Sequence, residues 1–397
     1  MEGKGRRVAV TGIGVIAACG TGKEAYWEGL LRPVTTVGTT RPVDDFDPSP
    51  WYENPKEARR ADRFAQFAMA AAAMALEDAG GEPPADPGRK GVMIASGVGG
   101  LNTLEEQIQI RLEKGVRRVS PFLVPMMMAN AGGASVSMRY GWQGPCETVV
   151  TACAASAHSI GNAARSIAWG RCDAVLAGGS ECSITPTAIA GFANMTALSS
   201  SGVSMPFDPR RDGFVMAEAA AVLVLEELEM ARARGAHIVG EILGAASNAD
   251  AHHITAPSPG GSGAVACMEL CLADAGLNAE DIVHINAHGT STPLNDAAEA
   301  EAITKLFGTP GPPVTSTKGV TGHALGAAGA LEAAAVLLAM EHRLIPPTVG
   351  TTELDPELAI DLVFGEPRPW EPGPTLSNSF GFGGHNGCVA LGPPPVD

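Results

Sequence analysis

The sequence predicts an α/β protein built in layers. Short segments rich in β-branched residues alternate with longer, Ala-rich segments along the whole chain, and Gly or Pro residues separate them. The 397 residues, of which 45% are hydrophobic, can bury a large core. Between residues 241 and 259 the pattern loosens into Ser, Asn, His and Pro, so we expect two halves, residues 1–245 and 246–397.

The expected strands are short apolar runs that turn residues bound on both sides. They cover residues 8–11, 91–95, 148–151, 174–177, 221–225, 282–286, 314–316 and 389–391. The expected helices are longer runs whose apolar residues recur at helical spacing. They cover residues 63–79, 153–169, 263–275, 297–307 and 324–340. No short-period repeat is present in the sequence, which argues against a solenoid.

Charge and hydropathy limit the function classes. The formal net charge is −16, from 27 basic and 43 acidic residues, which disfavours a nucleic-acid-binding surface. The first residues lack the apolar core of a signal peptide, and Glu332 interrupts the Ala-rich stretch at 324–340, so we expect no membrane span. We therefore expect a cytoplasmic protein that binds neither nucleic acid nor membranes.

The eight cysteines predict reduced thiols rather than a disulfide framework. None forms a Cys-x-x-Cys pair, and the chain is far longer than the modules that disulfides staple. Cys267 and Cys271 lie four residues apart, but no His or acidic residue accompanies them at ligand spacing, so we expect no metal site.

Cys153 lies where the chain changes character. A β-branched run at residues 148–151 precedes it and a stretch of small residues follows, so the thiol falls at the turn from an expected strand into an expected helix. The positive end of a helix dipole favours a thiolate, which makes Cys153 a candidate nucleophile. The alternative is a structural cysteine, because a free cysteine usually acts as a small buried hydrophobe.

The second half supplies candidate partners for this thiol. His288 directly follows an expected strand, at the strand end where open α/β sheets build their sites. His323 precedes the Ala-rich helix, with Lys318 five residues upstream and Glu332 inside that helix. A buried carboxylate there requires a partner, either Lys318 or a protonated histidine. Each histidine alone could be structural, but the residues together favour a catalytic site.

Four ordered motifs resemble the β-ketoacyl-acyl-carrier-protein synthases of the elongating, synthase II type. They are Val149-Val150-Thr151-Ala152-Cys153, then Asn286-Ala287-His288-Gly289-Thr290-Ser291-Thr292-Pro293, then Lys318 with Gly322-His323, and finally Asn378-Ser379-Phe380-Gly381-Phe382-Gly383-Gly384-His385-Asn386. The resemblance runs from Val8 to Leu391. It implies the thiolase fold, a five-layered αβαβα sandwich of two similar halves, and a homodimer as the usual state.

The resemblance also implies a decarboxylative Claisen condensation that uses no cofactor and no metal. Cys153 would accept the acyl chain as a thioester, and the backbone N–H groups of Cys153 and Phe382 would form the oxyanion hole. Malonyl carrier protein would then lose carbon dioxide, and His288 and His323 would stabilise the resulting enolate. Lys318 and Glu332 would form a pair that orients His323.

Further residues match substrate-binding positions of the family. They are Thr290, Thr292, Phe380, Phe382, Val98 and Met128. The two threonines would hydrogen-bond a pantetheine amide, and the two phenylalanines would gate the acyl channel on a Gly-rich loop. Val98 and Met128 would close the acyl tunnel and set the chain length. The alternative for the phenylalanines and for Met128 is an ordinary place in the core.

Basic residues gather at two places in this acidic chain. They are Lys56, Arg59, Arg60, Arg117 and Arg118. Their positions match the cationic patches on which the family docks its acidic acyl carrier protein. The alternative is that they are solvated cations without a partner.

The chain departs from the family pattern at three places. His385 stands where many members have Thr, Met205 stands where many have Arg, and the loop at residues 198–206 is short. These departures leave the identity of the acyl chain and of the carrier open.

Three rival functions share this fold or these motifs. A ketosynthase of a dissociated, type II polyketide pathway would use the same residues on another substrate, and it could form a heterodimer with a related subunit. A thiolase would carry a second catalytic cysteine in a Gly-rich C-terminal loop, whereas Cys388 lies at the edge of an expected strand. A non-catalytic chain-length partner would lack the thiol of Cys153. The motif at residues 288–293 leans toward fatty-acid synthesis.

Overall fold

Strands of both halves pair edge to edge in one main sheet. The structure, a computed structural model, describes residues 5–33 and 37–395. The strands of this sheet are β1 (Val8–Ala17), β2 (Gly20–Thr21), β4 (Lys90–Ala95), β5 (Cys146–Glu147), β6 (Ala174–Glu181), β8 (Ala219–Glu227), β9 (Gly240–Ala249), β10 (His284–Asn286), β11 (Pro313–Thr315), β13 (Asp361–Leu362), β15 (Thr375–Gly381) and β16 (His385–Gly392). Their order is β13-β11-β10-β15-β16-β9-β1-β8-β6-β4-β5, and β2 pairs with β1.

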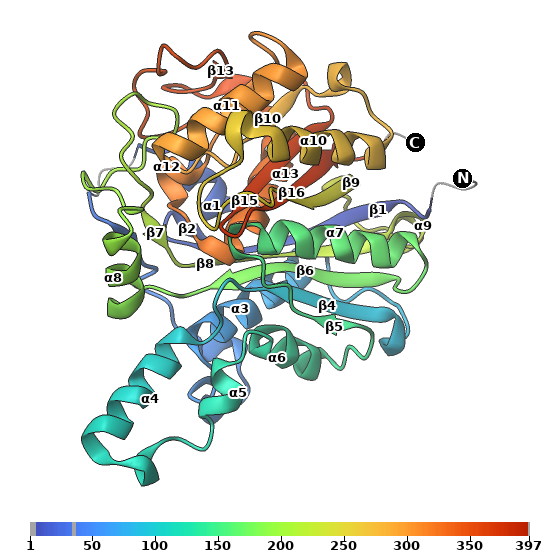
Figure 1. The fold of residues 1–397 in the computed structure, drawn as a ribbon. Helices are drawn as coiled ribbons and strands as arrows, with labels where there is room; N and C mark the ends of the chain where they lie inside the picture. The colour runs from blue at the N-terminus through green and yellow to red at the C-terminus, as the bar shows by residue number, and fades with distance from the viewer. Residues whose placement is uncertain (1–4, 34–36, 396–397) are drawn as a thin grey trace.

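Helices lie on both faces of this sheet and around it (Figure 1). They are α1 (Lys23–Leu30), α2 (Pro55–Ala58), α3 (Arg63–Asp78), α4 (Leu101–Lys114), α5 (Leu123–Met127), α6 (Ala131–Tyr140), α7 (Ala155–Ala168), α8 (Pro186–Asn194), α9 (Leu228–Ala233), α10 (Ser262–Ala275), α11 (Pro293–Phe307), α12 (Lys318–Thr321) and α13 (Ala328–His342). Two 3₁₀ turns, η4 (Ala152–Ala154) and η7 (Leu325–Ala327), lead into α7 and α13. Two small sheets pair β3 (Thr40–Arg41) with β7 (Met216–Ala217) and β12 (Leu344–Ile345) with β14 (Arg368–Pro369).

The main sheet divides into two half-sheets, because β1 pairs with β9 only from Val8 to Val10. α7 and α13 lie between the half-sheets and pack on both. α3 and α6 cover the outer face of the first half-sheet, and α10 and α11 cover the outer face of the second. The layers therefore follow one another as α, β, α, β, α, which confirms the predicted five-layered sandwich.

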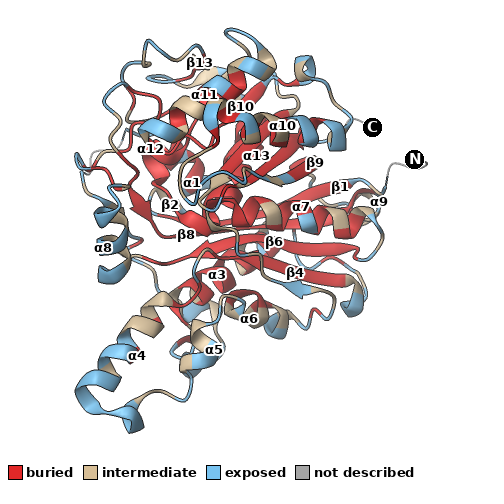
Figure 2. Ribbon diagram, viewed as in Figure 1, coloured by how far each residue is buried: buried red, intermediate tan, exposed pale blue. Residues whose placement is uncertain are grey.

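α13 lies in the middle of the molecule and is apolar on nearly every side. All its residues from Ala328 to Met340 are buried, because a half-sheet covers each face of the helix. Figure 2 shows the same burial in the flanking strands β6 and β8. The stretch Leu325–His342 has the length and hydropathy of a membrane-crossing helix, but 89% of it is buried inside the protein.

Small side chains let this middle layer approach both half-sheets closely. A Cβ at Gly179 of β6 would lie 2.7 Å from the Cβ of Ser156, and a Cβ at Gly329 would lie 2.9 Å from the backbone nitrogen of Ala157. The Ser156 hydroxyl accepts a hydrogen bond from the N–H of Ala330 at 2.9 Å. These contacts lock α7 and α13 side by side and bring η4 and η7, which precede them, together.

The structure contains every expected helix and most of the expected strands, and it corrects several details. Residues 148–151 form no strand, because β5 ends at Glu147 and the chain then leads into a turn with positive φ at Ala152. The sequence predicts neither β9 nor β15, since Ser and Asn interrupt their apolar runs. The predicted boundary between residues 245 and 246 falls inside β9, and the division into halves at that residue stays a prediction.

The structure also contains one long helix, α4, that the sequence does not predict, and it shows the state of the cysteines. The sequence does not predict α4, because this helix projects from the body of the molecule and buries only Thr103 and Gln107 (Figure 1). All eight cysteines are free, as expected. Cys267, Cys271 and Cys388 are buried together in the core of the second half.

Candidate active site

Cys153 lies in η4, the turn that leads into α7. Ala152, just before it, has a φ of 49°, a left-handed conformation that is uncommon for a residue with a side chain. The thiol borders a cavity of about 520 Å³ that residues of both halves line. Cys153 is therefore close to a helix start, as the sequence predicts, but a 3₁₀ turn precedes the α-helix and no strand does.

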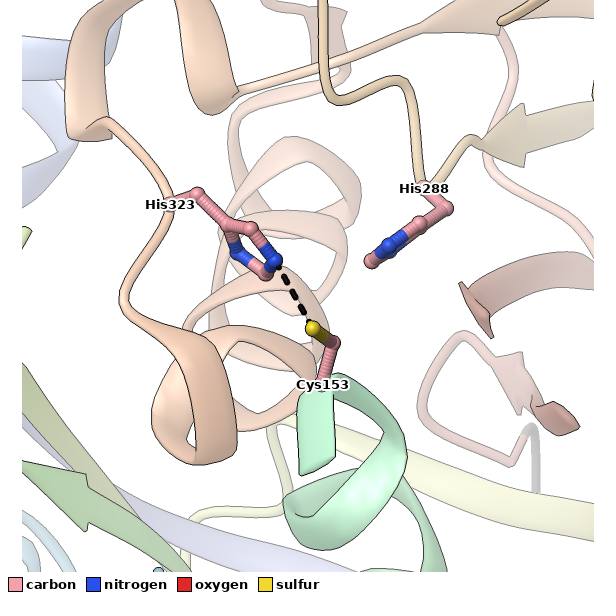
Figure 3. Close-up of side chains that lie close together, drawn as sticks. All are labelled: Cys153, His288 and His323. Atoms are coloured by element: carbon pink, nitrogen blue, oxygen red, sulfur yellow. Dashed lines mark hydrogen bonds between the residues drawn. The ribbon is translucent and has the colours of Figure 1, made fainter. Parts of the chain in front are cut away.

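His288 and His323 reach this thiol from the second half. The backbone of His323 is held by first-half residues, because its N–H donates to the Val215 carbonyl at 2.7 Å and its carbonyl accepts from the Ala217 N–H at 3.0 Å. His323 Nε2 lies 3.0 Å from Cys153 Sγ, and the rings of His323 and His288 are 5.4 Å apart (Figure 3). The structure thus brings the predicted nucleophile and both predicted histidines together.

Lys318 and Glu332 form a buried ion pair beside His288. The ammonium of Lys318 donates to a Glu332 carboxylate oxygen, to the His288 carbonyl at 2.6 Å and toward His288 Nδ1 at 3.3 Å. Because an ammonium can only donate, Nδ1 of His288 accepts, and the ring proton is carried by Nε2. The expectation that this pair orients His323 is therefore wrong, since its hydrogen bonds reach His288.

His323 packs against an aromatic ring and keeps one unpartnered nitrogen. Its ring meets the Phe214 ring edge to face, with centroids 5.3 Å apart. Nδ1 of His323 is buried and has no hydrogen-bond partner among the described residues. No contact therefore fixes the tautomer of His323, so its Nε2 can either accept a hydrogen bond from Cys153 or donate one to a bound group.

Burial decides the protonation states of the site. Burial and the charge of Lys318 hold the pKa of His288 and of His323 well below the usual range, so both imidazoles are neutral near pH 7. Burial raises the pKa of the Cys153 thiol to about 11, and Lys318 and the N–H of Phe382 offset only part of this effect. The expectation of a resting thiolate is wrong, because desolvation outweighs the favourable position near a helix start.

Two buried carboxylates that hold loops of the site are not predicted from the sequence. Glu299 of α11 accepts a hydrogen bond from the N–H of His288 at 2.8 Å. Glu181, at the end of β6, accepts from the N–H groups of Gly97 at 2.5 Å and Gly326 at 3.3 Å. Burial raises the pKa of each carboxylate to about 7. The sequence signal for Glu181 is its place at the end of the apolar run at residues 174–181. Glu299 lies among other acidic residues, and no sequence pattern distinguishes it from them.

Five of the six predicted substrate-binding residues line the cavity. They are Val98, Thr290, Thr292, Phe380 and Phe382. The hydroxyl oxygens of the two threonines are 2.9 Å apart, and the ring of Phe380 lies 6.0 Å from that of His288. Met128 does not line the cavity, and its side chain is 43% exposed. The backbone around Met127 and Ala129, rather than the Met128 side chain, packs against Gly99 in the loop that carries Val98.

The predicted docking residues lie on the surface of the first half. They are Lys56 in α2, Arg59 and Arg60 directly after it, and Arg117 and Arg118 in the 3₁₀ turn η3 (Val116–Arg118). All of them are exposed, and none lines the cavity. The guanidinium of Arg60 lies 4.3 Å from the centre of the Phe122 ring, which ties the end of α2 to the arm formed by α4 and α5.

The sulfur of Cys153 and the ring nitrogens of His288 and His323 are also close enough together to hold a metal ion. One ligand atom from each of Cys153, His288 and His323 lies within 4.8 Å of the others, and zinc accepts thiolate and imidazole ligands. However, the ammonium of Lys318 donates to His288 and would repel a second cation in this dry environment. The protonated thiol also disfavours a metal. The arrangement therefore suits a nucleophile beside two hydrogen-bond donors better than a metal site.

Comparisons with known proteins agree with this chemistry. Residues 33–231 match the family model of the β-ketoacyl synthase N-terminal domain, and residues 239–352 match the model of its C-terminal domain. The chain is 44% identical to proteins named 3-oxoacyl-[acyl-carrier-protein] synthase 2 from Synechocystis sp. and from Rhizobium meliloti, over 97% of this chain and 98% of each relative. The chain belongs to the β-ketoacyl synthase family.

Solved structures of β-ketoacyl synthases share the whole fold. The ishigamide ketosynthase/chain length factor matches with a TM-score of 0.91 and 36% identity, over 98% of this chain and 100% of that one. A β-ketoacyl synthase from Burkholderia phymatum matches over the same shares, with a TM-score of 0.89 and 35% identity. The protein is therefore an acyltransferase of the 3-oxoacyl-acyl-carrier-protein synthase II type, and its reaction is a ketosynthase condensation.

Alkylation of Cys153 should be slow at neutral pH and should accelerate steadily as the pH rises. With a thiol pKa of about 11, the thiolate fraction and the alkylation rate should rise about tenfold per pH unit between about pH 7 and about pH 9. The measurement is the rate of iodoacetamide modification of the peptide that contains Cys153, followed by mass spectrometry. A rate that already levels off in this range would show that the resting thiol is ionised.

Proposed function

We propose that this β-ketoacyl synthase elongates fatty acyl chains, by condensing an acyl thioester on Cys153 with malonyl carrier protein to give 3-oxoacyl carrier protein and carbon dioxide. The observation that supports the proposal most directly is the 3.0 Å contact between Cys153 Sγ and His323 Nε2. His288, whose proton Lys318 directs to Nε2, stands beside this contact. A decarboxylative condensation needs such a nucleophile next to two neutral N–H donors.

Loading transfers the acyl group from its carrier to Cys153. Sγ attacks the thioester carbon, the bond between this carbon and the pantetheine sulfur breaks, and the thiol proton ends on the departing sulfur. Nε2 of His323 can relay this proton, which a thiol with a pKa of about 11 must lose as it attacks. The backbone N–H groups of Cys153 and Phe382 would hold the oxyanion, and the Phe382 N–H already lowers the pKa of the thiol.

Condensation then extends the chain by two carbons. The malonyl carboxylate leaves as carbon dioxide, the remaining electron pair forms an enolate, and the enolate carbon attacks the acyl carbon and releases Cys153 as a thiolate. His288 and His323 donate to the enolate oxygen. Because both imidazoles are neutral, they stabilise the enolate without protonating it. The released sulfur takes up one proton from solvent, which balances the reaction.

The cavity suits a pantetheine arm that is followed by an apolar chain. Thr290 and Thr292 supply hydroxyl groups, and Val98 and the aromatic rings of Phe192 and Phe214 supply apolar wall. Phe380 lies near the end of β15, and Phe382 lies in the turn between β15 and β16, which also contains Gly383 and Gly384, both with positive φ. We assign the two phenylalanines to a gate that moves when an acyl chain enters.

A ketosynthase of a type II polyketide pathway is the second candidate. One matching structure is a type II PKS acyl-carrier protein in complex with its ketosynthase bound to the hexaketide, with a TM-score of 0.89 and 30% identity. The 3-oxoacyl-[acyl-carrier-protein] synthases 2 reach 44% identity, against 30% for this ketosynthase, and we therefore favour fatty-acid elongation for this chain. Both candidates use the same reacting residues, so the substrate distinguishes them.

Reconstitution with defined carriers tests the choice. We expect the purified enzyme to combine malonyl carrier with saturated acyl carriers and to yield 3-oxoacyl carriers, measured by mass spectrometry over a ladder of chain lengths. Cys153→Ala removes the nucleophile and should lower the rate about a thousandfold or more. Stoichiometric alkylation of Cys153 should abolish condensation in parallel. Failure with every saturated chain would instead support the polyketide pathway.

We also propose that an acidic acyl carrier protein docks on the docking cluster. This cluster is Lys56, Arg59, Arg60, Arg117 and Arg118. Within the described part of the chain, none of its members forms an ion pair, although the protein carries a net charge of −16. Exposed cations without an ion-pair partner in an acidic protein suit an acidic ligand, which they would also steer during association.

Charge reversal in the docking cluster should weaken carrier use without changing the chemistry. We expect Arg59→Glu combined with Arg117→Glu to raise the KM for acyl carrier about tenfold, with kcat unchanged and the effect reduced by added salt. The control is Arg171→Glu, the same change at an exposed arginine outside the cluster. An unchanged KM in the double variant would contradict the docking role.

We further propose that the chain pairs with a second copy along β5. This strand is the exposed edge of the first half-sheet, where backbone groups are open to another strand. The neighbouring arm and α6 expose Leu112, Val116 and Met138, which are 72%, 75% and 77% accessible. A related ketosynthase from Xenorhabdus doucetiae, with a TM-score of 0.84 and 26% identity, is in complex with its chain length factor.

In sedimentation measurements, the purified protein should have twice the mass of one chain, which is 40.5 kDa. Leu112→Glu together with Met138→Glu places charges on the exposed apolar surface and should shift the mass to that of one chain. Leu270→Glu, at an exposed apolar position of α10, should leave the mass unchanged. If the wild-type chain sediments as a single copy, the proposed pairing fails.

A further inference from the structure

His158 links two segments that meet at Cys153. It lies in α7, and it does not line the cavity. One ring nitrogen, Nδ1, is 2.8 Å from the hydroxyl oxygen of Thr151, and the other, Nε2, is 2.9 Å from the carbonyl oxygen of Asn386. The ring therefore bridges the segment just before Cys153 and the start of β16.

The two contacts fix which nitrogen of His158 carries the proton. A backbone carbonyl can only accept, so Nε2 donates to Asn386. In a neutral ring Nδ1 must then accept, and it takes the hydroxyl proton of Thr151. Burial lowers the pKa of His158, which is consistent with this neutral form.

Both ends of the bridge act on groups that touch the thiol. Thr151 precedes Ala152, whose φ of 49° is strained and persists only where neighbours hold it. Asn386 follows the loop between β15 and β16, whose Phe382 N–H lowers the pKa of the Cys153 thiol. A shift at either end would therefore move the thiol relative to this N–H.

Two glycines let these segments pack without space to spare. A Cβ at Gly387 would lie 3.0 Å from two ring atoms of His158. A Cβ at Gly381 would lie 3.0 Å from both the backbone nitrogen of Cys153 and the carbonyl oxygen of Thr151. The ring of His158 therefore packs tightly beside the turn that contains Cys153, and these close contacts leave the turn little room to shift.

We propose that His158 is a positioning residue, which clamps the turn of Cys153 against the loop of Phe382 so that Sγ points at the reacting carbon and at its oxyanion donors. His158 does not touch substrate and acts through Thr151 and Asn386. This role rests on the proposed condensation for its purpose, but the thiol geometry that it describes exists without substrate.

Two amide substitutions separate the two contacts of His158. In His158→Asn the side-chain oxygen can replace Nδ1, and in His158→Gln the side-chain nitrogen can replace Nε2. Because each keeps only one contact, we expect each to slow both iodoacetamide alkylation of Cys153 and acyl transfer from acyl carrier about tenfold, as when a reacting group loses its position. Decarboxylation of malonyl carrier needs the histidines of the site but not the thiol, so its rate should stay within about twofold.

Variants at Thr151 provide an independent test if the His158 variants fold poorly. Thr151→Val removes the hydroxyl at nearly constant volume and should slow alkylation, whereas Thr151→Ser restores the hydroxyl and should restore the rate. The control is His237→Gln, at an exposed imidazole far from these contacts. Thermal unfolding of each variant checks the fold.

Equal slowing of alkylation and decarboxylation would overturn the positioning role, because a general loosening of the fold affects both. Unchanged alkylation in both His158→Asn and His158→Gln would overturn it as well. If the wild-type enzyme condenses no acyl chain while alkylation still depends on His158 and Thr151, the proposed condensation fails and the positioning role stands.

Discussion

The buried contact between Lys318 and Glu332 governs the rest of the active site. Two charges without water are costly, and they persist here because they pair and because Lys318 donates its remaining protons to His288. These donations leave His288 a single tautomer. The charge of Lys318 also disfavours protonation of both imidazoles and opposes part of the effect of burial on the Cys153 thiol. Loss of either partner would leave an unpaired charge in the middle layer, and the tautomer and the protonation states would change with it.

The exclusion of water and the neutral state of both imidazoles together determine which reaction the site favours. A neutral N–H donor stabilises an enolate without giving up its proton, and its hydrogen bond to a developing anion is stronger where water is excluded. A thiol that stays protonated at rest is also less open to oxidation, because the thiolate is the reactive form. The same burial that makes the Cys153 thiol slow to ionise makes it effective once a thioester lies beside it, because His323 is already in contact with Sγ. The site therefore favours carbon–carbon bond formation over protonation of the enolate.

The sequence predicts the reacting residues better than their mutual contacts. Cys153, His288 and His323 stand at the ends of strands or before helices, where local patterns and motifs are strong. The expected pair of Lys318 and Glu332 is present. The histidine that this pair contacts was mistaken, because the sequence does not show that the ammonium reaches His288, 30 residues away, rather than His323. The protonation of Cys153 was mistaken as well, since it depends on burial by both halves. β9 and β15 escape prediction for a related reason: their polar residues form strands because neighbouring strands pair with them, β16 with β9, and both β10 and β16 with β15.

The site exists only because the two halves share their middle layer. The thiol of Cys153 begins one central helix and His323 precedes the other, so neither half alone holds both the nucleophile and its histidine. The two helices touch through Ser156, Ala157 and Gly329, where any larger side chain would push them apart. The turn η4, which contains Ala152 and Cys153, packs against η7 and α13 in the same layer, so the fold and the position of the thiol depend on one set of close contacts. Small residues in this layer bury less hydrophobic area than larger ones would. Because they are small, the helices approach closely enough for the sulfur of Cys153 and the imidazole of His323 to be in contact.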